Sequence, residues 1–141
     1  MPTVEMTFTP LPAHVRTARL VATAVARRSG VPEALLDEVR LAVGEACSRA
    51  VEVHQQHCPA EPVRVALTGA GERFEVVVTN TAAGDDGMTW PPQPVDGQAP
   101  AALPAELGLA VIAGLADDVQ VSRNGDGLSI RMSWPSGPPA G

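Results

Sequence analysis

The sequence is poor in several features that define whole classes of protein. Its two cysteines are too few for a small domain held together by disulfides. No apolar stretch reaches the roughly 20 residues that cross a bilayer, because charged residues or proline interrupt each one. The 10 basic residues, all arginine, are outnumbered by 16 acidic ones, and a net charge of −6 argues against general nucleic-acid binding. With no secretion signal at the start of the sequence, we expect a cytoplasmic protein without nucleic-acid or membrane partners.

Aromatic residues are also scarce. They make up 3% of the 141 residues, whereas the chain has 13 Gly and 14 Pro. The length fits a single domain with one hydrophobic core. With so few aromatic side chains available, this core is expected to consist mainly of Ala, Val and Leu.

Hydrophobic periodicity and turn residues divide the chain into strands and helices. Apolar residues at helical spacing predict three helices, of which the second is the longest. Alternating or β-branched runs predict the strands. The expected order is a strand at 3–9, helices from about 12 to 28 and from about 32 to 57, strands at 63–67 and 73–78, a helix at 105–116, and strands at 119–122 and 128–134.

A long segment between the predicted elements has no periodicity. Residues 82–104 are dominated by Ala, Gly, Pro and Asp, and loops of this length in a small domain are usually functional or disordered. The hairpins and the grouped helices indicate an α+β fold, a two-layer sandwich with helices on one face of a mostly antiparallel sheet. We expect one domain over residues 1–134, with 82–104 as a flexible loop, and a disordered tail at 135–141.

The second predicted helix carries a pair of charged residues one turn apart, Glu45 and Arg49. Such a pair is often only a solvated ion pair, worth a few tenths of a kcal/mol. Alternatively, Glu45 is a carboxylate that points into a pocket and acts as a general base on a hydroxyl or water. Spacing alone does not separate these two interpretations.

The surrounding motifs add information. The helix has Glu45-Ala46-x-x-Arg49-Ala50-Val51, and a later segment reads Leu107-Gly108-Leu109-Ala110-Val111-Ile112 and Ala116-Asp117-Asp118-Val119. Over residues 5–133 this arrangement resembles the bacterial anti-sigma factors that are also serine kinases. These belong to the GHKL superfamily of histidine kinase-like ATPases, which share the Bergerat fold. The resemblance implies that the loop at 82–104 is a lid over ATP.

The resemblance assigns family roles to residues of the helix motif, and one of them is altered here. The family has a Glu that acts as the base and, four residues later, an Asn that holds magnesium. Glu45 matches the base, whereas Arg49 stands at the Asn position. A guanidinium has only donors and cannot ligate Mg²⁺, although it can pair directly with phosphate.

The second family motif, which contacts adenine, is altered too. The family has an Asp at the end of the hairpin, followed by Gly two and four residues later. This sequence has Asn80, Ala82 and Gly84 at those positions. Asn80 retains an acceptor oxygen, but Ala82 adds a methyl group where the backbone approaches the base. A similar Asp85-Asp86-Gly87 lies past the predicted strand end and fits the position less well.

The third family motif is a Gly-x-Gly at the start of the helix that follows the lid, where backbone N–H groups hold the phosphates. Gly108 matches its second Gly, whereas Glu106 replaces the first and places a carboxylate where phosphate is expected. Both residues also have ordinary explanations, namely helix N-terminal stabilisation and close packing. The degenerate nucleotide-binding set is therefore Arg49, Asn80, Gly84, Glu106 and Gly108.

The altered motifs favour a protein that acts by binding partner proteins. No cofactor is expected, and ATP with Mg²⁺ would be one only if the altered site still binds the nucleotide. The resemblance implies a sigma factor, a STAS-domain anti-anti-sigma factor, or both as partners, and allows a homodimer. An active serine kinase that phosphorylates the STAS partner is the alternative. The predicted partner surface is a row on the first helix, Arg16, Arg19, Arg27 and Arg28.

Other candidate sites are weaker. The run His54-x-x-His57-Cys58 has residue types that bind zinc, but it lacks a distant ligand pair with standard spacing, so no metal site is expected. Cys47 is expected to pack in the core instead of acting as a nucleophile.

Overall fold

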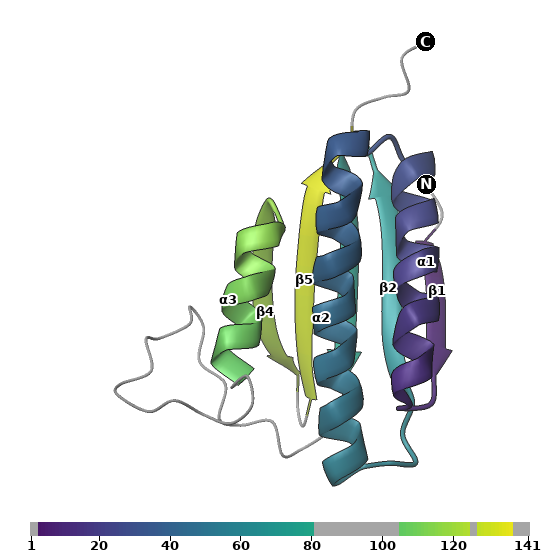
Figure 1. Ribbon diagram of the computed structural model, residues 1–141, viewed down its shortest axis with the longest axis vertical. Coiled ribbons are helices and arrows are strands. Elements are labelled where there is room, and N and C mark those ends of the chain that lie inside the picture. Colours follow the sequence, from purple (N-terminus) through teal and green to yellow (C-terminus); the bar gives the residue numbers. More distant parts are fainter. Residues whose placement is uncertain (1–2, 81–104, 125–126, 137–141) are drawn as a thin grey trace.

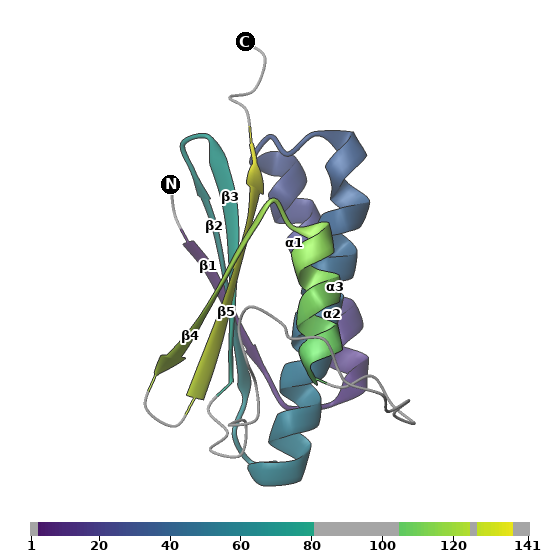
Figure 2. The same ribbon diagram turned by 90° about the vertical axis from the view of Figure 1, so that its left-hand side faces the viewer.

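The computed structural model describes residues 3–80, 105–124 and 127–136, and shows two layers. Three helices cover one face of a five-stranded sheet (Figure 1), and a view from the side separates the helix layer from the sheet (Figure 2). The predicted α+β sandwich is therefore confirmed. The elements are β1 (Thr3–Phe8), α1 (Pro12–Arg28), α2 (Glu33–His57), β2 (Val63–Ala70), β3 (Arg73–Asn80), α3 (Ala105–Leu115), β4 (Asp118–Asn124) and β5 (Gly127–Pro135).

The sheet has the strand order β1-β2-β3-β5-β4, and each neighbouring pair is antiparallel. β2 and β3 form a hairpin whose turn contains Gly71 with φ of 61°, a conformation that glycine adopts without steric cost. The register sets Val76 of β3 opposite Met132 of β5, both of them buried, while Val77 and Arg131 lie on the other face. This alternation places the apolar side chains of the central strands under the helices.

The helices bury narrow stripes of small side chains. α1 begins at Pro12, whose fixed φ suits the first helical turn, and it buries Val15 and three alanines at helical spacing. α2 begins after Pro32 and lies between α1 and α3 in the helix layer (Figure 1). Small residues at these contacts allow the helix axes to approach each other closely. The helix layer therefore packs tightly on the sheet without aromatic residues of its own.

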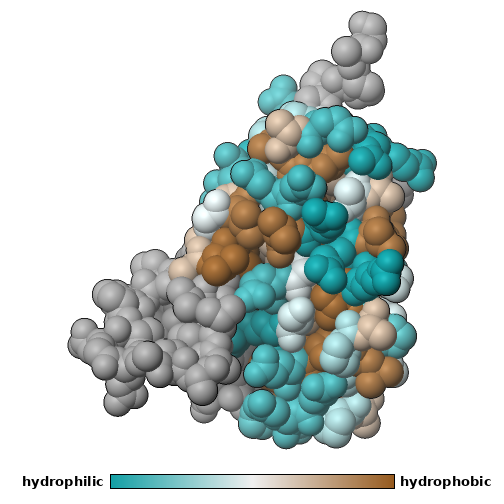
Figure 3. Space-filling view, in the orientation of Figure 1, coloured by the Kyte–Doolittle hydropathy of each residue, from teal (hydrophilic) through white to brown (hydrophobic). Residues whose placement is uncertain are grey.

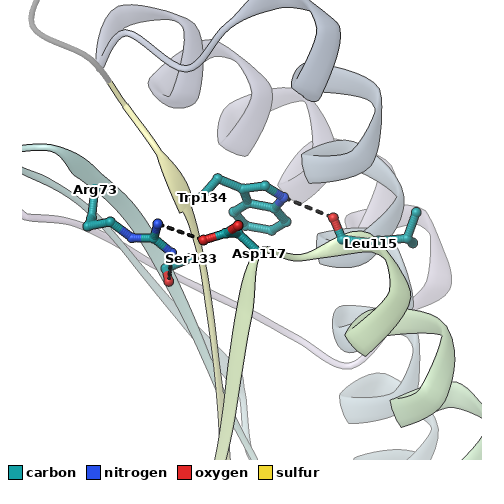
Figure 4. A network of polar contacts seen from close by, with 5 residues as sticks. All are labelled: Arg73, Leu115, Asp117, Ser133 and Trp134. Carbon is teal, nitrogen blue, oxygen red and sulfur yellow. Dashed lines mark hydrogen bonds and ion pairs between the residues drawn. The ribbon is translucent and has the colours of Figure 1, made fainter.

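The core has the predicted composition, because Val, Ala and Leu supply most of its buried side chains. Two of the few aromatic residues, Phe74 and Trp134, are also fully buried, with ring centroids 6.3 Å apart. They lie on β3 and β5 and are its two largest side chains. Trp134 fills the region where the end of α3 meets the sheet (Figure 4).

The face of the sheet that the helices leave uncovered is polar among the described residues. Thr3 and Thr68 share a hydroxyl hydrogen bond of 3.0 Å, and the Nε atom of Arg131 lies 2.7 Å from the Glu75 carboxylate. Arg64 is exposed on the same face. These groups satisfy one another or face solvent, which suits a sheet that is covered on one side only.

All predicted elements are present, and their ends differ from the expectations by a few residues. β2 continues through Gly69 and Ala70, so the turn is shorter than expected. β5 extends to Pro135, and Ser136 donates its backbone N–H to the Glu72 carbonyl at 2.8 Å, so the predicted tail begins later than expected. Residues 137–141 of that tail and the lid-like loop at 82–104 lie outside the described residues.

Candidate functional site

Glu45 and Arg49 lie near the middle of α2, on the part of the helix that faces away from the sheet. The core side of α2 is marked by Val43, Cys47 and Ala50, which are buried. Glu45 lies two residues from both Val43 and Cys47, a rotation of about 200° around the helix axis. Glu45 and Arg49 are half-buried, and the Nε atom of Arg49 is fully enclosed.

Asn80 is the last residue of β3 and belongs to the inner face of the sheet. Buried and half-buried positions alternate along β3, so Asn80 shares the helix-covered face with Val76 and Val78. Only 3% of Asn80 is exposed, and its side-chain oxygen is buried. A buried amide at the end of a central strand provides both a donor and an acceptor for a polar ligand.

Three parts of the fold meet at one end of the molecule. α2 and β3 run in the same direction, so β3 ends beside the C-terminal half of α2 (Figure 1). α3 packs along α2 and begins at this same end, and its first backbone N–H groups carry the positive end of the helix dipole. Asn80 therefore lies at the end of the molecule where α3 starts, whereas Glu45 and Arg49 lie nearer the middle of α2.

The remaining predicted residues of this site are described only in part. Glu106 and Gly108 belong to the first turns of α3, as predicted, but only their backbone is described. Gly84 lies outside the described residues. The described part of the site therefore consists of Glu45, Arg49, Asn80 and the start of α3.

The donor set of this site does not fit a magnesium ion at Arg49. A guanidinium offers N–H donors and no lone pair, whereas Mg²⁺ is bound by oxygen atoms. The same group suits an anion, because it forms charge-assisted hydrogen bonds with phosphate or carboxylate. The described residues therefore combine one cation, one carboxylate and one buried amide, and Arg49 supplies no ligand for a divalent metal.

A polar network fixes the far end of α3 to the sheet (Figure 4). Trp134 donates its indole N–H to the carbonyl of Leu115, the last residue of α3, at 3.1 Å. Just beyond the helix, Asp117 accepts a hydrogen bond of 2.7 Å from Arg73, which also donates to the Ser133 hydroxyl at 2.6 Å. The network joins the C-terminal end of α3 to β3 and β5.

The predicted arginine row on α1 is not one continuous surface. Arg16, Arg27 and Arg28 are exposed, and Arg27 pairs with Glu33 at 3.3 Å. Arg16 and Arg27 lie about 20° apart around the helix axis, whereas Arg28 is turned about 100° further. Arg19 is half-buried and packs against α2, so it is less accessible than the other three, and the partner-binding role of the four arginines stays a prediction.

Gly44 on α2 is a close-packing position that the sequence reasoning missed. A Cβ atom at this position would lie 2.6 Å from Cδ of Arg19, which is closer than real Cβ contacts allow. The available signal was a glycine in the middle of a 25-residue helix, where it costs about 1 kcal/mol relative to alanine and needs a packing reason.

The histidine and cysteine residues have structural roles. His54 is fully buried, and its Nδ1 atom lies 2.8 Å from the Glu61 carbonyl oxygen. Cys47 is fully buried as well, and desolvation raises the pKa of its thiol to about 12, while the charge of Arg19 opposes this rise. In the described part of the chain, no three His, Cys, Asp or Glu residues cluster in a way that could hold a metal. None of the described helices is long and apolar enough to cross a membrane.

The fold is an α+β sandwich with helices on one face of an antiparallel sheet, and comparison with known proteins identifies the family. The model of the histidine kinase-like ATPase domain matches residues 8–134. The chain therefore belongs to the family of histidine kinase-like ATPase domains, which confirms the superfamily expected from its motifs.

A solved structure has the same fold at low sequence identity. It contains the RsbU and RsbW domains of Rv1364c from Mycobacterium tuberculosis, and it matches with a TM-score of 0.67 and 18% identity. The match covers 98% of the present chain and 34% of that chain, so the present chain spans about a third of the longer protein's length. No curated protein sequence matches.

Proposed function

We propose that this protein is an anti-sigma-factor-like regulator that acts by protein–protein binding in a partner-switching system controlling transcription. Membership of the histidine kinase-like ATPase family and the fold shared with a structure containing RsbU and RsbW domains support this proposal. The proposed partners are a sigma factor, a STAS-domain anti-anti-sigma factor, or both. Such a regulator acts in the cytoplasm, and a homodimer is compatible with the proposal.

We also propose that its ATP binding is weakened or lost. The observation that carries this proposal is Arg49, a half-buried cation on α2 at the position where the resembling family has a magnesium-binding Asn. Asn80 replaces the adenine-contacting Asp, and Glu106 replaces a phosphate-loop Gly. Each change removes or opposes one interaction with Mg-ATP, so together they disfavour the nucleotide.

Calorimetric titration with ATP and ADP, with and without Mg²⁺, tests the loss of nucleotide binding. We expect weak or undetectable binding and no strengthening by Mg²⁺, because Arg49 supplies no metal ligand. Arg49→Asn restores an amide oxygen and is the matched variant, in which Mg²⁺ should strengthen nucleotide binding. Tight Mg-dependent binding by the unmodified protein would instead support the second candidate.

That second candidate is an active serine kinase that phosphorylates a STAS-domain partner. The observation that favours it is Glu45, which remains at the position of the catalytic base and is half-buried on the outward side of α2. If the protein is a kinase, phosphate transfer from ATP to a STAS-domain protein is detectable and disappears in Glu45→Ala. If it is a binding protein only, Glu45→Ala leaves partner binding unchanged.

A further inference from the structure

A pocket of about 300 Å³ lies between α1 and α2, on the opposite side of α2 from α3. Its volume is at the lower end of the range found for small-ligand sites. The space-filling view of the helix face shows mixed hydrophilic and hydrophobic side chains over α1 and α2, with an apolar patch over α3 (Figure 3). The pocket is lined by Pro12, Val15 and Arg19 from α1 and by Ser48, Val51, Glu52 and Gln55 from α2.

The side chain of Arg19 lies close against α2 at Gly44. Its Cδ and Cγ atoms pass 2.6 Å and 3.2 Å from the place where a side chain on Gly44 would begin. Its charge also reaches Cys47, because it partly opposes the rise in the pKa of that thiol. The absent side chain of Gly44 thus leaves room for the stem of Arg19 to lie against α2, and a larger residue at position 44 would displace it.

Arg19 forms no ion pair within the described part of the chain. The ion pairs there involve other arginines, and Glu52, which lines the same pocket, forms none with Arg19. A half-buried guanidinium without an ion-pair partner has its planar set of N–H donors available for a ligand. Carboxylate oxygens match this geometry and form two parallel charge-assisted hydrogen bonds with it.

The rest of the pocket limits the kind of anion. Val15 and Val51 line the pocket but are only 5% and 3% exposed, so they offer a small apolar contact that suits no more than a short aliphatic stem. The carboxylate of Glu52 repels ligands with several negative charges and therefore disfavours phosphates. Ser48 contributes a hydroxyl group, whereas the amide nitrogen of Gln55 already donates to the Pro10 carbonyl at 2.9 Å.

We propose that this pocket binds a single carboxylate carried on a short apolar stem, with Arg19 as the anion-binding residue and Gly44 as the residue that positions it. Two sources carry this chemistry, namely a glutamate side chain of a partner protein and a free short-chain carboxylic acid. The inference goes beyond the proposed function, since the pocket binds the carboxylate whether or not the protein regulates a sigma factor.

Nuclear magnetic resonance titration of the full chain tests the pocket. The probes are 4-methylpentanoate and the capped dipeptide acetyl-Leu-Glu-amide, with 4-methylpentanamide and acetyl-Leu-Gln-amide as uncharged controls. We expect saturable shifts of the Arg19 side-chain N–H and the Gly44 amide with the acids, and affinities at least about tenfold lower for the amides. Tighter binding of the dipeptide indicates a protein side chain as the source, and tighter binding of the free acid indicates a metabolite.

The decisive variant is Gly44→Ala. It leaves the charge of Arg19 unchanged, but the new Cβ displaces the Arg19 side chain, so carboxylate affinity should fall about tenfold, as in Arg19→Gln. Alanine favours a helix interior more than glycine does, so thermal unfolding should show an intact fold. Arg16→Gln, on the same helix but exposed, should bind the acids normally.

Three results would overturn the proposal. One is equal binding of the acids and the amides, which would show that the charge is not recognised. Another is wild-type affinity in folded Gly44→Ala or in Arg19→Gln. The third is the absence of saturable shifts with both acids. None of these depends on nucleotide binding or on partner binding, so failure of the pocket is distinct from failure of the proposed function.

Discussion

Cys47 shows how burial changes the chemistry of a single side chain. Its thiol is fully enclosed on the core side of α2, where desolvation disfavours the thiolate and raises the pKa from 9.0 to about 12. The charge of Arg19 opposes this effect but is the smaller of the two causes. The thiol therefore stays protonated at neutral pH, and the prediction that Cys47 packs in the core instead of acting as a nucleophile is consistent with its environment.

This raised pKa predicts how stability depends on pH. Between pH 9 and pH 12 the folded chain keeps the Cys47 proton, whereas the unfolded chain loses it. The free energy of unfolding is therefore unaffected by this group below about pH 9 and falls as the pH rises above that value, with a slope on the order of 1 kcal/mol per pH unit. Urea unfolding between pH 8 and pH 11 measures the slope.

The composition leaves few other groups that could contribute to this pH dependence. The chain has no Tyr, and all its basic residues are Arg, so the two cysteines are the only side chains that usually titrate in this range. Cys47→Ala should remove most of the slope, while Cys58→Ser should retain it. The same slope in Cys47→Ala as in the unmodified protein would show that another group causes the dependence.

At the scale of elements, α3 depends on its connection to the sheet. Its composition is apolar, so packing on α2 accounts for most of its burial, but the direction of the helix also depends on its fixed C-terminal end. The indole of Trp134 reaches the Leu115 carbonyl from within the core, whereas Arg73 and Asp117 meet near the surface. The two interactions belong to one network but differ in exposure, and hence in energy.

We therefore expect unequal effects from two conservative substitutions. Trp134→Phe removes the donor for the Leu115 carbonyl and also reduces the volume of a fully buried side chain, so the free energy of unfolding should fall by about 2–4 kcal/mol. Asp117→Asn weakens an ion pair whose Asp117 side chain is 54% exposed and should cost less than about 1 kcal/mol. Urea denaturation of both variants checks this order, and a greater loss in Asp117→Asn would contradict it.

At the scale of the whole molecule, positive charge is concentrated on one helix. α1 carries Arg16, Arg19, Arg27 and Arg28 and no acidic residue, whereas the complete chain has a net charge of −6. The exposed members of this set create a local positive field on a protein that is otherwise acidic. Such a field accelerates the association of an acidic partner more than it strengthens the final complex.

The matched pair Arg16→Glu and Arg64→Glu tests this effect. Both arginines are exposed, but one lies on α1 and the other on the uncovered face of the sheet. Arg16→Glu should lower the association rate with a proposed partner, a sigma factor or a STAS-domain protein, by about tenfold at low salt, and the difference should shrink as salt screens the charge. Surface plasmon resonance measures the rates, and equal effects of the two reversals would exclude α1 as the partner surface.

Periodicity along the chain was sufficient to predict each helix and strand within the residues that the structure describes. The stripe of Val15, Ala18 and Ala22 specifies a helix, and the alternation in β3 specifies a strand with one buried face, because both patterns are properties of neighbouring residues. The ends of elements were less accurate. Ser136, for example, is positioned by a hydrogen bond to Glu72, which is distant in the sequence.

The sequence by itself therefore determined the two-layer α+β architecture and the histidine kinase-like family, since these depend on local patterns and short motifs. Tertiary structure alone decided that Asn80 is buried under the helices. It also decided that Arg19 packs against α2 at Gly44, apart from the exposed arginines of α1. Helical spacing relates residues of one helix to each other. The position of a neighbouring helix, which separates Arg19 from Arg16, is set by packing between residues far apart in the chain.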